Sequence, residues 1–138
     1  MIVANTKQGH KYLLIGYPAI VPKKFGSEGI FSQHIYKLEV KDGSPLTRIF
    51  LYYLLKSQEV WEQVVGAANG STVNMLPANG LETAEFNLPP SQIINDFTSI
   101  AANMLDKQEQ NILDIETLSH LRDTLLPKLM SGEVRVRV

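Results

Sequence analysis

The stretch PPSQIINDFTSIAANMLDKQEQNILDIETLSHLRDTLLPKLMSGEVRVRV, residues 89–138, decides how this 138-residue chain is organised. After Pro90 it contains no glycine before Gly132 and no proline before Pro127. Apolar residues recur along it at steps of mostly three or four, which is the pattern of a single apolar stripe on a helix. The stripe comprises Ile93, Phe97, Ile100, Met104, Ile112, Ile115, Leu118, Leu121, Leu125 and Leu129.

The predicted helix is too long for one small domain to bury. From Ser91 to Met130 it would extend for about 60 Å at a rise of ~1.5 Å per residue. Leaving the stripe in water is costly, because apolar burial contributes roughly 25 cal/mol per Å². We therefore expect the stripe to pack against a second helix, formed when the chain folds back or supplied by another chain. The alternative is an ordinary buried helix of a bundle.

Three features punctuate this helix. Lys107, Gln108 and Asn111 interrupt the stripe, either as a polar layer that sets the register of pairing or as a solvent-facing stretch, and we favour the second. Pro127 lies inside the helical pattern and predicts a kink or a break. Gly132 predicts the end of the helix, and residues 133–138 form a short alternating tail.

Before Pro89, the spacing of apolar residues switches several times between alternation and helical periodicity, which predicts a mixed body of strands and helices. Residues 46–68 have helical spacing, with a break predicted at 56–58. Ser44-Pro45 suits the start of that helix, since serine can cap it and proline is tolerated at its first position. Loops or turns are predicted at 26–29, 41–45 and 70–76. Strands are predicted at 11–21 (interrupted by a turn at Gly16 and Pro18), at 35–40 and at 83–88.

Pro89-Pro90 marks the one clear boundary in the composition, because paired prolines block a sheet and force an extended connection. We expect residues 1–88 to form a small mixed body and residues 89–138 to form a helical spacer and dimerisation region. The predicted fold class is α+β, with the long helix in an antiparallel coiled coil with a partner helix.

Composition restricts the class of protein. The formal net charge is −1, so no global electrostatic argument names a partner. There is no cysteine, which excludes disulfides and thiolate chemistry and fits a cytoplasmic protein. No apolar run approaches the roughly 20 residues of a membrane span. The N-terminus lacks the pattern of a signal peptide, and we expect no membrane partner.

Enzyme chemistry finds no support in the sequence. His10, His34 and His120 are scattered and lack metal-ligand spacing. No nucleophile motif or phosphate-binding glycine loop occurs, so we expect no catalytic residue, no metal and no cofactor. The carboxylates of the long helix are best interpreted as a solvated face. They are Asp106, Glu109, Asp114 and Glu116.

Two groups of polar residues are candidates for DNA contacts. Residues 1–25 contain lysines and no acid, and lysines can neutralise phosphates, although four lysines are also an ordinary solvated surface. The loop near residue 70 offers side chains that hydrogen-bond phosphates or base edges, or that cap the local backbone instead. Gly70 itself is expected to have a structural role. The candidates are Lys7, Lys11, Lys23, Lys24, Asn69, Ser71, Thr72 and Asn74.

The sequence resembles a known family at three sites that occur in the family's order and spacing. Residues 118–136 read LSHLRDTLLPKLMSGEVRV, which resembles the end of a target-recognition half in the specificity subunit of type I restriction–modification systems. Residues 68–76, ANGSTVNML, resemble that family's G-S-T-x-x-x-L loop. Leu88-Pro89-Pro90 resembles the hinge at which the family's chain leaves the recognition domain for a long helix.

The resemblance implies a function. Such subunits carry two recognition domains, each reading one half of a split DNA site, joined by two long helices that pack antiparallel. The helices set the distance between the half-sites and dock the methylation and restriction subunits. The specificity subunit itself catalyses nothing.

This chain departs from that pattern by having one recognition domain, which it enters partway along. We therefore expect a fragment, a truncated reading frame or a half-subunit. The leading hypothesis is a protein that recognises double-stranded DNA and pairs through its helix with a second copy or a partner half. The alternative is a helical assembly module without independent DNA binding.

Overall fold

The computed structural model describes residues 1–8, 14–26, 28–70 and 73–135. Three of the candidate DNA contacts, Lys11, Ser71 and Thr72, lie outside these residues, as does the end of the predicted tail. The described chain has small antiparallel sheets and a long C-terminal helix, which confirms the α+β class. It divides into two compact units, Met1–Ile100 and Ala101–Val138.

The strands of the first unit form two small sheets. One is three-stranded in the order β3-β1-β4, and the other pairs β2 with β5. All their pairings are antiparallel. The strand predicted at 35–40 is present but shorter, and the first two strands were not predicted. The bounds are β1 Ile2–Ala4, β2 Thr6–Gln8, β3 Pro18–Ala19, β4 Ile35–Lys37 and β5 Val73–Met75.

Asn5 is the point at which the chain passes from one sheet to the other. Its backbone N–H donates to the His34 carbonyl at 3.0 Å, and its carbonyl accepts from the Leu76 N–H at 2.7 Å. Its side-chain amide donates to the Gln33 carbonyl at 3.0 Å, and it is buried. The backbone of Asn5 thus bonds both neighbouring segments, and its side chain adds a bond to the segment before β4, which helps strands of three residues hold their register.

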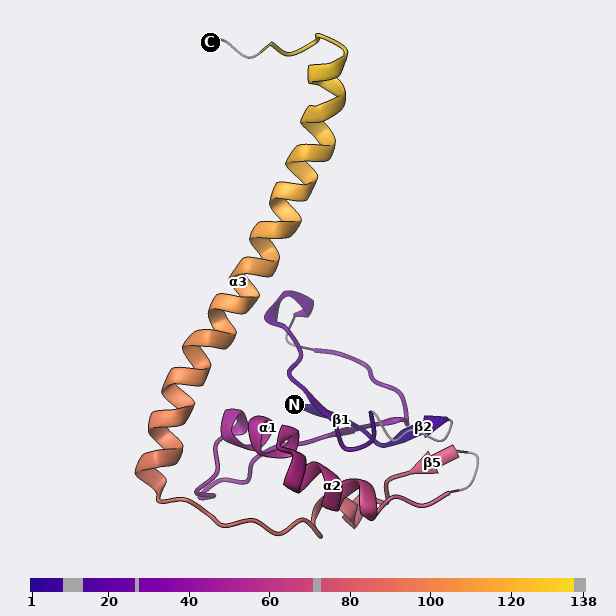
Figure 1. The fold of residues 1–138 in the computed structure, drawn as a ribbon, viewed down its shortest axis with the longest axis vertical. Coiled ribbons are helices and arrows are strands. Elements are labelled where there is room, and N and C mark those ends of the chain that lie inside the picture. Colours follow the sequence, from indigo (N-terminus) through magenta and orange to yellow (C-terminus); the bar gives the residue numbers. More distant parts are fainter. Residues whose placement is uncertain (9–13, 27, 71–72, 136–138) are drawn as a thin grey trace. The chain divides into compact units, whose positions relative to one another are not determined.

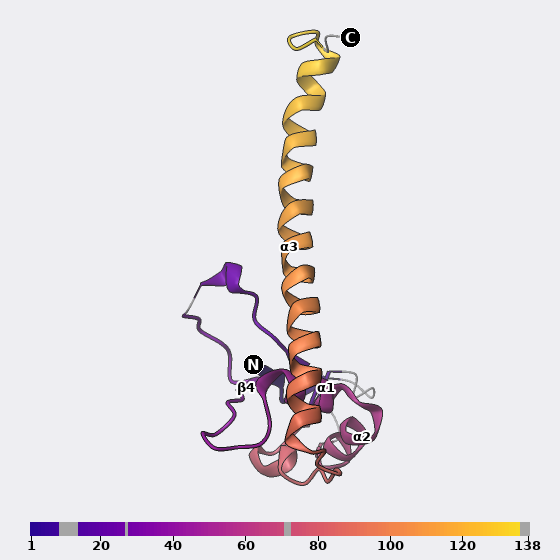
Figure 2. The same cartoon turned by 90° about the vertical axis from the view of Figure 1, so that its left-hand side faces the viewer.

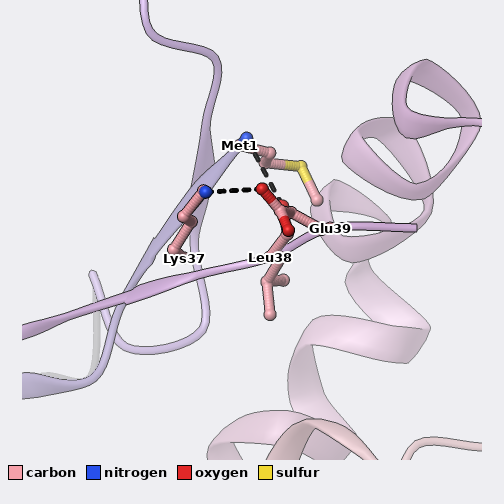
Figure 3. A network of polar contacts seen from close by, with 4 residues as sticks. All are labelled: Met1, Lys37, Leu38 and Glu39. Carbon is pink, nitrogen blue, oxygen red and sulfur yellow. Dashed lines mark hydrogen bonds and ion pairs between the residues drawn. The ribbon is translucent and has the colours of Figure 1, made fainter. Parts of the chain in front are cut away.

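The N-terminal end of β1 is fixed against the chain that follows β4 (Figure 3). The Met1 amino group donates to the Leu38 carbonyl at 3.5 Å, and the Leu38 N–H donates to the Met1 carbonyl at 2.9 Å. Lys37 and Glu39 form an exposed ion pair beside this contact. Partial burial lowers the pKa of the Met1 amino group, and the nearby Arg48 charge adds to the effect.

Two helices, α1 Arg48–Lys56 and α2 Gln58–Gly66, replace the predicted helix at 46–68, and the break falls at Ser57 as expected. The predicted cap is wrong. The hydroxyl of Thr47 accepts from the Phe50 N–H at 3.1 Å, whereas the Ser44 hydroxyl accepts from Leu46 and closes the preceding turn. Because Ser44 is used in that turn, the helix begins three residues later, at the next side chain able to cap it.

The core of the first unit lies between these helices and the strands (Figure 1). It consists of Val3, Ile15, Leu55, Val60, Val64 and Leu76. The Trp61 indole N–H donates to the Ile15 carbonyl at 2.9 Å, which ties α2 to the turn before β3. Gly16 in that turn has a φ of 72° and abuts Val64, so a Cβ there would displace a core side chain.

The strand predicted at 83–88 is wrong. Residues 84–90 have no regular secondary structure. The side chain of Gln63 donates to the Glu85 carbonyl at 2.9 Å and accepts from the Glu85 N–H at 2.8 Å. A side chain thus uses the backbone groups that a neighbouring strand would have paired, so alternation alone did not produce a strand here.

The long helix α3 runs from Ser91 to Met130 as one continuous element (Figure 2). No break occurs at Pro127, which lies within the last turn: its missing N–H removes one helical hydrogen bond, and its own carbonyl still accepts from the Ser131 N–H at 2.9 Å. The predicted stop is confirmed: Gly132 has a φ of 76°, and its N–H donates to the Leu129 carbonyl at 3.2 Å.

Candidate nucleic-acid and helix interfaces

The sheet of β2 and β5 brings two candidate DNA contacts together. Lys7 and Asn74 are direct partners in this pair, although they come from opposite ends of the first unit's sequence. Asn69 closes the intervening loop, because it exchanges backbone hydrogen bonds of 2.9 and 2.7 Å with Met75. Asn69 and Gly70, which precede β5, therefore lie beside the strand pair that contains Lys7.

The asparagines of this loop differ in exposure. Asn69 is exposed, whereas Asn74 is only 3% exposed, which favours a structural role for the Asn74 side chain. Gly70 has a φ of 132°, and a Cβ there would meet the carbonyl of Val73. The structure thus supports the structural role expected for Gly70.

Lys23 and Lys24 lie on another element, the 3-10 helix η1 Lys23–Phe25 in the connection between β3 and β4. Both side chains are exposed. The Lys24 ammonium lies 5.5 Å from the ring centroid of Phe25, which is itself exposed. A cation next to an exposed ring can contact a phosphate and a base in the same region.

A cationic site that the sequence analysis missed surrounds Lys56, in the last turn of α1. Its ammonium lies 5.0, 5.6 and 6.0 Å from the ring centroids of Tyr52, Tyr17 and Tyr53. It also donates to the Tyr52 hydroxyl at 3.3 Å, and this bond raises the pKa of Lys56. Within the described residues Lys56 forms no ion pair with a carboxylate. The Tyr-Tyr-x-x-Lys spacing was the available signal.

The first turns of α3 pack within the first unit. Ile94 is fully buried, a residue that the predicted stripe omitted. The ring of Phe97 lies edge-on to those of Phe50 and Tyr53, with centroid distances of 5.8 and 5.4 Å. The Thr47 and Thr98 hydroxyls are 2.6 Å apart. Ile94 was missed because two faces of α3 carry apolar residues in its first turns, whereas the predicted stripe follows only one face.

The predicted interface residues remain exposed along the rest of α3. The seven apolar residues from Met104 to Leu129 are between 40% and 65% exposed. In the first unit Ile93 and Ile100 are also more than half exposed, and Phe97 is 38% exposed. An exposed apolar face of this extent is typical of a surface that binds another macromolecule.

Other kinds of site find no support in the described part of the chain. It contains no group of three His, Cys, Asp or Glu side chains that could hold a metal ion. No helix among these residues is long and apolar enough to cross a membrane. His34 hydrogen-bonds the Thr6 hydroxyl at 2.8 Å.

An α+β body with exposed cations, continued by a helix with an exposed apolar face, defines a protein built to bind macromolecules. The chain belongs to the type I restriction modification DNA specificity domain family, whose sequence profile matches residues 2–121.

Two relatives are type I restriction enzyme specificity subunits. The MjaIX subunit of Methanocaldococcus jannaschii is 33% identical over 85% of this chain and 26% of its own length. The HindI subunit of Haemophilus influenzae is 29% identical over 62% of this chain and 19% of its own length. This chain thus spans about a quarter or less of either relative. No solved structure matches it significantly.

Proposed function

We propose that this chain recognises double-stranded DNA as one half of a type I specificity subunit. The observation that carries the proposal is the family profile, which spans the body and most of α3. In this account residues 1–88 read one half of a split site. Residues 89–138 set the distance to a second recognition body and dock the methylation and restriction subunits. The chain itself catalyses nothing and acts in the cytoplasm.

Lysines of the body supply the contacts with DNA phosphates. Lys7, Lys23 and Lys24 were predicted from the sequence. Lys56 is added as a phosphate contact because its charge has no carboxylate partner in the described chain. Tyrosine hydroxyls next to an ammonium add donors for phosphate oxygens. The side chain of Asn69 is the exposed amide candidate of the G-S-T loop.

Equilibrium binding to duplex DNA as a function of salt tests the DNA role. Each phosphate neutralised by a lysine contributes about 0.9 to the slope of log K against log salt. The unaltered chain, alone or with a methylation subunit, should show a negative slope. Salt-independent binding, or none to any duplex, would contradict the proposal.

Single variants can identify the cations that bind DNA. Lys23→Glu and Lys24→Glu should weaken binding, and Lys56→Met should lower the slope by about 1 while its alkyl chain still covers the tyrosines. Lys41→Glu, in an exposed turn of the same unit, is the matched control and should leave the affinity almost unchanged. Equal effects at Lys41 and at the three candidate lysines would contradict the assignment.

A second function, assembly without DNA reading, rests on a different observation. The apolar face of α3 is exposed whether or not the body binds DNA. If the charge variants leave binding unchanged while the helix still associates with another subunit, this alternative replaces the first.

A further inference from the structure

The cationic site at Lys56 and the attachment of α3 share one group of aromatic rings. The ring of Tyr53 lies edge-on to that of Phe97 in α3, with a centroid distance of 5.4 Å, and to that of Tyr52, with a distance of 5.0 Å. The Lys56 ammonium lies 5.0 and 6.0 Å from the centroids of Tyr52 and Tyr53. Tyr53 therefore connects the first turns of α3 with the cationic site.

The spacing of residues within α1 produces this arrangement. Tyr52 and Tyr53 precede Lys56 by four and three residues, so both rings come from the helical turn next to the lysine. Phe50 precedes Tyr53 by three residues and adds a second ring to the contact with α3, at 5.8 Å. Tyr17, from the chain just before β3, lies 5.6 Å from the ammonium. One helix of nine residues thus carries both the cation and the rings that hold α3.

The rings hold the Lys56 ammonium in one place. A lysine side chain has several rotatable bonds, and fixing it on binding a ligand costs conformational entropy. Here the Tyr52 hydroxyl accepts one hydrogen bond from the ammonium at 3.3 Å, which leaves two of its three donors for another acceptor. The Tyr17 ring is 42% exposed, so the site borders solvent. A lysine held in this way can bind a phosphate with a smaller loss of entropy than a free one.

We infer that Phe97 is a positioning residue for the phosphate contact of Lys56. This inference rests on the proposed function, in which Lys56 binds a phosphate of duplex DNA. Phe97 itself contacts no DNA in this account. Its ring packs on the edge of Tyr53, Tyr53 packs on Tyr52, and the Tyr52 hydroxyl holds the ammonium. The first turns of the spacer helix are thereby linked to a DNA contact of the body through successive side-chain contacts.

The competing interpretation is that Phe97 contributes to packing alone. The Thr47–Thr98 hydrogen bond and the buried side chain of Ile94 also attach α3, so the ring would then be one contact among several. The two interpretations differ in what they predict for salt dependence. A packing role changes the stability of the first unit and leaves the number of neutralised phosphates unchanged. A positioning role lowers that number, which the slope of log K against log salt measures.

The test is the affinity of the full chain for duplex DNA over a series of salt concentrations, with folding checked by circular dichroism. Phe97→Leu keeps an apolar side chain and should weaken binding about threefold to tenfold, the equivalent of one edge-to-face ring contact. It should also lower the salt slope by about 0.5 to 1. Phe97→Tyr keeps the ring and should retain both values. Phe86→Leu, at a phenylalanine of similar exposure, 37% against 38%, is the matched control and should change neither.

A double-mutant cycle separates the inference from the proposed function. In a chain that already carries Lys56→Met, Phe97→Leu should have almost no further effect on DNA affinity. Tyr53→Leu removes the linking ring and should reproduce the loss seen with Phe97→Leu, which keeps the test valid if the latter does not fold.

Three results would overturn the inference while salt-dependent DNA binding persists. They are equal effects of Phe97→Leu in both backgrounds, an unchanged slope in Phe97→Leu or Tyr53→Leu, and an unchanged slope in Lys56→Met. If the unaltered chain shows no salt-dependent binding to any duplex, the proposed function itself is contradicted.

Discussion

The two stretches of helix α3 have the same amphipathic spacing but different surroundings. Residues 91–100 belong to the compact unit of the body, where Ile94 is buried and Phe97 packs against two aromatic rings. Residues 101–130 form the second unit, and their large apolar side chains on the stripe remain exposed. One sequence pattern thus serves two purposes: attachment to the chain's own core, and a surface available to a partner.

The first stretch is held to the body by contacts that the second stretch lacks. The aromatic contacts and the Thr47–Thr98 hydrogen bond fix the first turns of α3 to α1. We therefore expect changes in the attached stretch to alter stability, and changes in the exposed stretch to alter association.

The largest expected effect separates the two stretches directly. Ile94→Ala should destabilise the first unit by about 2–5 kcal/mol, because it leaves a cavity at a fully buried site. Leu118→Ala removes an equally apolar side chain from the exposed stretch and should change unfolding of the monomer by less than about 0.5 kcal/mol. Urea unfolding at a concentration below the dimer dissociation constant measures both. Equal losses would show that the second stretch also packs on its own chain.

A smaller effect tests the attachment of α3 to α1. Thr47→Val removes both the cap of α1 and the hydrogen bond to Thr98, and should cost about 1–2 kcal/mol. Thr117→Val is the control, because the Thr117 hydroxyl donates only to the Leu113 carbonyl of its own helix, at 2.9 Å. Thermal unfolding should show a lower midpoint for the first variant alone. Unchanged stability of Thr47→Val would mean that the aromatic contacts suffice for attachment.

The smallest expected effect sharpens the account of the exposed stretch. Asn111→Leu should tighten a dimer paired through α3 by about tenfold, or ~1.4 kcal/mol, because an apolar residue then replaces an exposed polar one that interrupts the apolar stripe. It should also weaken the preference for one orientation. Sedimentation gives the affinity, and weaker association in this variant would exclude Asn111 from the interface.

Much of this organisation could be predicted from the sequence, for physical reasons that differ between elements. The helix at 91–130 and the break at Ser57 follow from local periodicity and breakers, which act over a few residues. The capping role of Thr47 and the absent strand at 83–88 depend on side chains such as Ser44 and Gln63, whose hydrogen bonds compete with regular structure.

The candidate site was less accessible to sequence analysis. Lysines could be identified by type, but the Lys56 cluster exists because Tyr17 lies next to α1 in the folded chain. Pairing of Lys7 with Asn74 likewise depends on contacts between strands far apart in sequence. The stripe on α3 was found from its spacing, whereas its two uses depend on where the core of the body lies.

The most direct test of the antiparallel pairing uses single cysteines, since the chain contains none of its own. Ile93→Cys and Leu129→Cys mark the first and last residues of the apolar stripe, about 54 Å apart along a helix. A mixture of the two variants, oxidised and analysed on a non-reducing gel, should give a disulfide-linked dimer joining one variant to the other. Either variant oxidised alone should remain uncrosslinked. Self-crosslinking of each variant alone, with no preference for the mixed dimer, would contradict the antiparallel pairing.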